Sequence, residues 1–245
     1  MDRLIYTALS GLQRATEAQA VTANNLANAQ VPGFRREMAA LSAGWTVSDG
    51  AALSSRVQSG GESPHDLMNP GRVEHTGGRL DVAMDGDAWL AVSGSDGGES
   101  LTRRGDLRLD AEGRLLTGDG RPVLGEDGPI TVPAGAAEVA IDRSGSIRTR
   151  AAADAPFVSI GKLRLVSPDP ATLTRQPDGL FRPPQPLDAD PTATVTNGAI
   201  ERSNVEPSAA LVELIQQSRS FELQTRLITT ARELDEGSAA LMRVN

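Results

Sequence analysis

The sequence predicts an α+β protein whose N- and C-terminal helices pair as a coiled-coil-like bundle, with an inserted, mostly antiparallel β domain between them. Two observations predict the helices: both ends of the chain carry apolar residues at intervals of seven, the spacing of a helical seam. A third observation predicts the β domain, because between residues 74 and 182 apolar and polar residues alternate between Asp-Gly and Glu-Gly turns.

Residues 1–34 are predicted to form the N-terminal helix of the helical domain. Two rows repeat every seven residues: Ile5, Leu12, Gln19 and Leu26, and then Ala8, Ala15, Thr22 and Ala29. Heptad spacing places both rows on one face of a helix. Because alanine buries little apolar area, this helix needs a partner to be stable. Asn28 and the Pro32-Gly33 pair are expected to end it.

The middle of the chain is predicted to contain three parts. Residues 35–73 show no clear period and are rich in glycine, serine and proline, which indicates a loop-rich connector. The β domain at 74–182 follows, and its first hairpin-type turn is Asp85-Gly86 between two apolar runs. Residues 183–200 begin with a proline-rich stretch and are predicted to be an extended linker to the last helix.

Residues 201–245 are predicted to form the C-terminal helix of the helical domain. Its start has two alternatives: a capping box from Ser203 to Glu206, or a first helical residue at Pro207 with Glu206 as the cap. Two apolar rows step by seven along it: Leu214, Phe221 and Ile228, and beside them Leu227, Leu234 and Leu241. The combined stripe is broader than one seam and indicates contact with more than one neighbouring helix. Simple packing of both helices on the β domain is also compatible with this periodicity.

The composition excludes several classes of protein. The chain has 24 basic and 32 acidic residues, a net charge of −8, which argues against a surface for nucleic acid or anionic membranes. The absence of cysteine excludes disulfides, thiolate zinc sites and cysteine nucleophiles. The sequence contains neither an apolar run long enough to insert in a membrane nor a signal-peptide pattern at its start.

Catalytic and metal-binding motifs are not found. His65 and His75 lack the spacing of a zinc protease, and Lys162 lacks the glycine and hydroxyl residues of a phosphate-binding loop. The aspartates beside glycines lack the alternating ligand spacing of calcium loops, and this pairing is typical of turns. We therefore predict no catalytic residue, no cofactor and no metal site, and we do not expect an enzyme.

Three separated segments carry further motifs, in a fixed order along the chain. Residues 23–34 read ANNLANAQVPGF. The other motifs lie at 80–86, 101–105 and 113–115 in the β domain, and at 203–205, 211–215 and 219–222 near the C-terminus. Together they resemble the bacterial flagellar basal-body rod and hook protein family, and residues 1–11 look like the opening of its proximal-rod member.

The resemblance implies a structural subunit of the flagellar rod, the drive shaft for motility that crosses the periplasm. It implies that the paired helices line the tube while the β domain lies outside. The implied partners are other proximal and distal rod proteins, further copies of this chain in a helical assembly, and the type III export apparatus. The implied location is the flagellum basal body, reached without a cleaved signal peptide, and neither nucleic acid binding nor membrane insertion is expected.

Two alternatives accompany this interpretation. The first is another flagellar axial protein, of the distal rod or hook. The second belongs to a different class, a secreted β-rich binding module whose helices form an oligomerisation stalk. The occurrence of a seam at both termini rather than one argues against the second alternative.

The candidate assembly interface combines seam residues with the asparagines of the N-terminal motif. It comprises Ile5, Leu12, Asn24, Asn25, Leu26, Asn28, Leu214, Phe221, Ile228 and Leu234. Asn24 and Asn28 are four residues apart and share one helix face, so their amides could bridge neighbouring helices. Alternatively, Asn28 caps the end of the helix shortly before Pro32.

Overall fold

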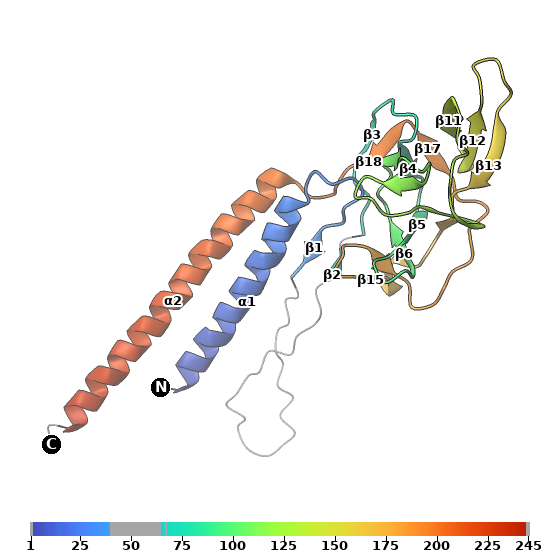
Figure 1. The fold of residues 1–245 in the computed structure, drawn as a ribbon. Coiled ribbons are helices and arrows are strands. Elements are labelled where there is room, and N and C mark those ends of the chain that lie inside the picture. The colour runs from blue at the N-terminus through green and yellow to red at the C-terminus, as the bar shows by residue number, and fades with distance from the viewer. Residues whose placement is uncertain (1, 40–64, 67, 244–245) are drawn as a thin grey trace. The chain divides into compact units, whose positions relative to one another are not determined.

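The computed structural model describes residues 2–39, 65–66 and 68–243, and the chain divides into two compact units (Figure 1). The helical unit comprises Met1–Ala29, Arg36–Leu67 and Val205–Asn245, and the β unit comprises Gln30–Arg35 and Met68–Asn204. Both α-helices belong to the helical unit, whereas strands β3 to β18 belong to the β unit. The predicted α+β class is confirmed.

The helical unit is built on α1 (Asp2–Ala27) and α2 (Pro207–Arg243), which run antiparallel and side by side (Figure 1). Of the two predicted starts for α2, the structure has the one at Pro207, a residue type suited to the first helical position. The strands β1 (Glu37–Met38) and β2 (His65–Asp66) form an antiparallel pair in this unit. Residues 40–64 of the predicted connector, and residue 67, lie outside the described residues.

The two helices approach closely where α1 carries small residues. A Cβ atom on Gly11 would lie 2.9 Å from the side-chain oxygen of Gln224. Nearer the other end of α1, Gln217 Nε2 donates a hydrogen bond of 2.9 Å to the hydroxyl of Thr22. Because interhelical distance depends on the side chains at the contact, the small residues of α1 permit this approach.

The β unit consists of short antiparallel strands. One sheet has five strands in the order β14-β5-β6-β16-β15, another has three in the order β11-β12-β13, and the remaining strands form two-stranded pairs. The strands are β3 (Val73–His75), β4 (Val82–Met84), β5 (Trp89–Ser93), β6 (Glu99–Thr102), β7 (Leu107–Leu109), β8 (Leu115–Thr117), β9 (Leu124–Gly125), β10 (Gly128–Pro129), β11 (Glu138–Ile141), β12 (Ser146–Arg150), β13 (Val158–Lys162), β14 (Leu165–Val166), β15 (Thr174–Arg175), β16 (Phe181–Arg182), β17 (Val195–Asn197) and β18 (Ala199–Glu201). A short 3₁₀ helix spans Pro170–Thr172.

Two apolar clusters fill the β unit, and β5 contributes to both. Successive side chains of a strand point to opposite faces, so Leu90 belongs to the larger cluster and Trp89 to the smaller one. In the smaller cluster the rings of Trp89 and Phe181 meet edge to face, with centroids 5.0 Å apart. The continuous apolar run of β5 therefore corresponds to a strand buried on both faces.

The segment 183–200, predicted to be a linker, contributes strand residues to the β unit. β17 pairs with β4, with Val195 opposite Met84, and β18 pairs with β3. The turn between them is Asn197-Gly198, and Gly198 adopts a φ of 68°, which glycine reaches without strain. Because Val195 and the first residue of β18 are fully buried, this segment packs into the unit, which extends to Asn204.

Candidate assembly interface

One face of α2 carries a row of half-buried apolar residues, which we call the inner row: Leu214, Phe221 and Ile228. Gln217 and Gln224, the residues that contact α1, are spaced along the same face. The inner row therefore faces α1, and Leu12 and Leu26 of α1 are themselves half-buried. The predicted interface residues Ile5 and Leu234 lie within α1 and α2, but their side chains lie outside the described set.

A second apolar row of α2 is exposed, and we call it the outer row: Leu211, Val212, Ile215, Leu223 and Leu227. These side chains are between 48% and 61% exposed. Val212 and Phe221 are nine residues apart, which at about 100° per residue places them on opposite sides of the helix. In the sequence, Leu227 belongs to a seven-residue row, and Leu211, Val212 and Ile215 belong to the motif at 211–215, but no row was predicted from them. The spacing of four between Leu211 and Ile215 and between Leu223 and Leu227 is the signal that indicates this row.

The contact between α1 and α2 also contains polar side chains. Thr22 is buried, and its hydroxyl accepts from Gln217, whose amide also lies 3.3 Å from Glu213. Among the described residues, the side-chain oxygens of Gln217 and Gln224 are buried and lack a hydrogen-bond partner. An unsatisfied buried acceptor costs free energy, so this seam is weaker than an apolar one of the same length.

The asparagines of the N-terminal motif are used within the chain. Asn25 is buried, its amide nitrogen donates to the carbonyl of Glu37 at 2.7 Å, and its side-chain oxygen accepts from the amide of Glu37 at 2.9 Å. Asn28 donates to the main-chain oxygen of Asn24 at 2.9 Å. Asn25 therefore connects β1 to α1 through both polar groups of its side-chain amide. The side chain of Asn28 adds a second donor to the carbonyl of Asn24, which already accepts the main-chain amide of Asn28, and also donates to Asn24 Oδ1 at 2.8 Å.

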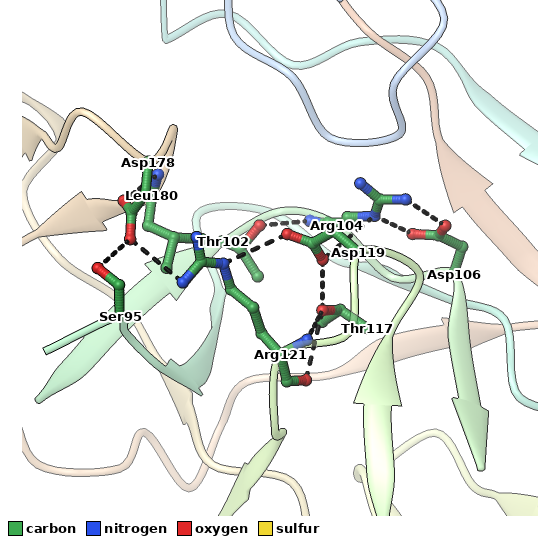
Figure 2. A network of polar contacts seen from close by, with 9 residues as sticks. All are labelled: Ser95, Thr102, Arg104, Asp106, Thr117, Asp119, Arg121, Asp178 and Leu180. Atoms are coloured by element: carbon green, nitrogen blue, oxygen red, sulfur yellow. Dashed lines mark hydrogen bonds and ion pairs between the residues drawn. The ribbon is translucent and has the colours of Figure 1, made fainter. Parts of the chain in front are cut away.

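The β unit carries a network of charged and hydroxyl side chains (Figure 2). Asp119 accepts from Thr117 at 2.5 Å and pairs with Arg121 at 3.3 Å, and Arg121 pairs in turn with Asp178 at 3.2 Å. Nearby, Arg104 forms two hydrogen bonds with Asp106, of 2.7 and 2.9 Å. Each of these carboxylates is matched by a guanidinium group, an arrangement that fixes loops and leaves no paired carboxylates for proton transfer.

A second charged cluster of the β unit is buried. Arg35, Arg103 and Glu201 have side chains no more than 4% exposed, and both arginines form ion pairs with Glu201. Burial is the largest influence on Glu201 and by itself raises its pKa, but Arg103, Arg35 and the amide of Gly71 together outweigh it and hold the pKa below its ordinary value. Burial also lowers the pKa of Arg35, against the opposing effect of Glu201. This cluster has no signal in the sequence, because Arg35 and Glu201 are 166 residues apart.

Within the described ranges, His, Asp and Glu side chains do not gather in groups of three that could hold a metal ion. Over the same ranges, neither helix combines the length and the apolar character that crossing a membrane requires.

Comparison with known proteins finds similarity along the whole chain. Family models match residues 5–35 ("Flagella basal body rod protein"), 83–149 ("Flagellar hook protein FlgE/F/G D1 domain") and 196–241 ("Flagellar basal body rod FlgEFG protein C-terminal"). The chain is 40% identical to the flagellar basal-body rod protein FlgF of Salmonella typhimurium, over 98% of this chain and 97% of that protein. It is also 40% identical to FlgF of Escherichia coli, over 94% of each, and 27% identical to the rod protein FlgG of Agrobacterium fabrum, over 95% and 96%.

Proposed function

Because this chain belongs to the flagellar basal-body rod protein family and is most like FlgF, we propose that it builds the proximal rod by polymerising through α1 and α2. It is a structural subunit of the basal-body rod, and its relatives are structural rod proteins rather than enzymes. The identity of 40% to the FlgF proteins of Salmonella typhimurium and Escherichia coli, over nearly the whole chain, supports the proximal rod.

The observation that carries this proposal is that α2 is apolar on the face toward α1, where the inner row lies, and also over much of its remaining surface, where the outer row lies. The inner row lies against α1, whereas the outer row is exposed in the single chain. An exposed apolar row of this length is typical of a surface that another protein covers. A helical assembly supplies such a cover, because each α2 then packs against its own α1 on one side and against helices of neighbouring subunits on the other.

Within each subunit, we propose that α1 and α2 pair as a coiled-coil-like bundle. The seven-residue spacing of Leu12 and Leu26 with their neighbours, and of the inner row, supports this geometry. In the assembled rod the predicted interface residues divide by role. Ile5, Leu12, Leu26, Leu234 and the inner row bury apolar surface, while Asn24, Asn25 and Asn28 shape the end of α1.

The proposed partners are further copies of this chain, the other proximal rod proteins and the distal rod protein. The match of this chain to both FlgF and FlgG proteins over nearly their full lengths supports a shared mode of assembly. We further propose that the subunit reaches the periplasmic part of the basal body through the flagellar type III export apparatus, keeping its N-terminus.

A charge in the outer row tests the proposal. In cells lacking their own copy of the gene, Leu223→Asp is expected to be exported but to leave the cells non-motile, because assembly would bury an unpaired carboxylate. Thr229→Asp is the matched control, since it places the same charge at an exposed position of α2 that lies six residues from Leu223 and about 120° around the helix from it. Swimming in soft agar and the amount of subunit in the medium are the measurements. Normal motility with Leu223→Asp would exclude the outer row as an assembly surface.

A further inference from the structure

The segment Gln30–Arg35 belongs to the β unit by its contacts although it follows directly after α1. It contributes no residue to the two apolar clusters of that unit, whose described members begin at Met68. Its next neighbour, Arg36, belongs to the helical unit and pairs there with Glu213 at 2.7 Å. The segment is therefore held on the β unit mainly by polar and cation–π contacts. Among them, Arg175 donates to the carbonyl of Arg35 at 2.5 Å, and its guanidinium lies 5.0 Å from the centre of the Phe34 ring.

The site that receives this segment is largely complete without it. Arg103 donates to the carbonyl oxygens of Met84 at 3.0 Å and Gly86 at 2.8 Å, and also to that of Ala88. Its guanidinium also pairs with one carboxylate oxygen of Glu201 at 2.6 Å. These groups all lie in the body of the β unit, so Arg103 and Glu201 form a neutral buried pair whether or not the segment is in place.

Among the three side chains of the buried cluster, that of Arg35 has the fewest hydrogen-bond and ion-pair partners in the described part of the chain. Its guanidinium pairs with the second carboxylate oxygen of Glu201, which also accepts the amide of Gly71 at 2.8 Å. Its Nε is buried and has no hydrogen-bond partner among the described residues. The face of Trp89, 5.9 Å away, offers only a cation–π contact. Arg35 thus adds a second positive charge to a site that holds one carboxylate.

The main chain of the segment runs beside residues 201–204. The amide of Gly33 donates to the carbonyl of Glu201 at 2.8 Å, and the amide of Asn204 donates to the carbonyl of Phe34 at 3.3 Å. Gly33 has a φ of 68°, and a Cβ atom there would collide with the backbone of Arg103. The docked segment brings the connection from α1 beside the connection to α2, at one place on the β unit.

We propose that Gln30–Arg35 is a strap that docks on the β unit and releases from it as a separate step, with Arg35 as its anchor and Glu201 as the receiving group. Docking fixes the point on the β unit from which the chain continues to α1, relative to the point from which it continues to α2. The docked strap is therefore the assembly-competent state, a consequence that rests on the proposed function. Arg35 and Gly33 act as positioning residues rather than as contacts with another subunit.

Hydrogen exchange of the full chain, followed by mass spectrometry, tests the strap in the monomer. We expect Arg35→Met to lower the protection of amides in 30–35 by about tenfold or more while amides in 88–93 keep theirs. Arg36→Met is the matched control, because its partly exposed pair with Glu213 lies in the helical unit. Gly33→Ala blocks the same docking sterically and is expected to reproduce the effect of Arg35→Met with all charges intact.

The outcomes separate the strap from the proposed function. The strap is excluded if the amides of 30–35 and 88–93 lose protection together in Arg35→Met. It is also excluded if neither Arg35→Met nor Gly33→Ala changes the protection of the amides in 30–35. Co-sedimentation with a purified FlgG-type rod protein then tests assembly, and we expect Arg35→Met to fail where Arg36→Met succeeds. Assembly of Arg35→Met with its strap open would overturn the assembly role. Failure of the unchanged chain to co-sediment would instead count against the proposed function and leave the exchange result standing.

Discussion

Replacing Glu201 with glutamine is predicted to destabilise the β unit far more than the loss of an exposed ion pair does. The substitution keeps the size of the side chain and removes the carboxylate that Arg35 and Arg103 share. Arg103 retains three main-chain acceptors, whereas Arg35 is left buried without a counter-charge. The free energy lost is therefore mainly that of Arg35, and it is at most the free energy with which the strap docks, because release of the strap returns Arg35 to solvent.

Breaking a buried ion pair by removing one partner costs about 3–5 kcal/mol. Glutamine still offers an oxygen to the amide of Gly71, so we expect the lower end, about 3 kcal/mol, a large share of a typical unfolding free energy of about 5–15 kcal/mol. Asp96→Asn is the control, because the ion pair of Asp96 with Arg182 is exposed. Pairs of that kind contribute about 0–1 kcal/mol.

Urea unfolding followed by the fluorescence of Trp89 measures this difference. Trp89 is buried in the β unit, and Trp45, which lies outside the described residues, is replaced by phenylalanine in every variant. A double-mutant cycle adds Arg35→Met to Glu201→Gln. In that background, Arg35→Met should lower the unfolding free energy little further, or even raise it, because it removes the unpaired charge. A loss no larger than that of Asp96→Asn, or fully additive effects of the two substitutions, would refute the reasoning.

Three further predictions address the seam, the pH dependence and the β unit. Phe221→Asp and Leu26→Asp should each abolish co-sedimentation with rod subunits, while the melting temperature of the β unit stays constant. Retained co-sedimentation would contradict the assignment of these two residues to the interface. Glu201 has a depressed pKa, so its stabilisation is complete above the ordinary value of 4.5 and is lost as the pH falls through the lower folded value. The difference in unfolding free energy between the unchanged chain and Glu201→Gln should therefore shrink below pH 4.5 in urea titrations, and a constant difference would contradict it. A fragment of residues 68–204 should unfold cooperatively by circular dichroism, whereas 74–182 should be less stable because it lacks β17 and β18; equal stability of the two would contradict this division.

Local patterns predicted the elements whose formation depends on neighbours in the sequence. The seven-residue rows predicted α1 and the inner row of α2, because helical geometry places such residues on one face. The apolar run at Trp89 and Leu90 beside Asp85-Gly86 predicted a buried strand after a turn, because side-chain alternation and glycine conformation act over a few residues. The motif at 23–34 pointed to the family before any fold was known.

The tertiary structure decided everything that joins distant parts of the chain. Neither Arg35 nor Glu201 stands out in its own segment, and only folding brings them together across 166 positions into a buried pair. The role of Asn25 is similar, since the polar groups it satisfies belong to Glu37 on a strand that no periodicity indicated. The sequence also did not determine which row of α2 is covered, because two apolar rows on one helix look equivalent until α1 packs against one of them. Sequence spacing determines which residues share a face, but burial of that face depends on partners whose position only long-range packing fixes.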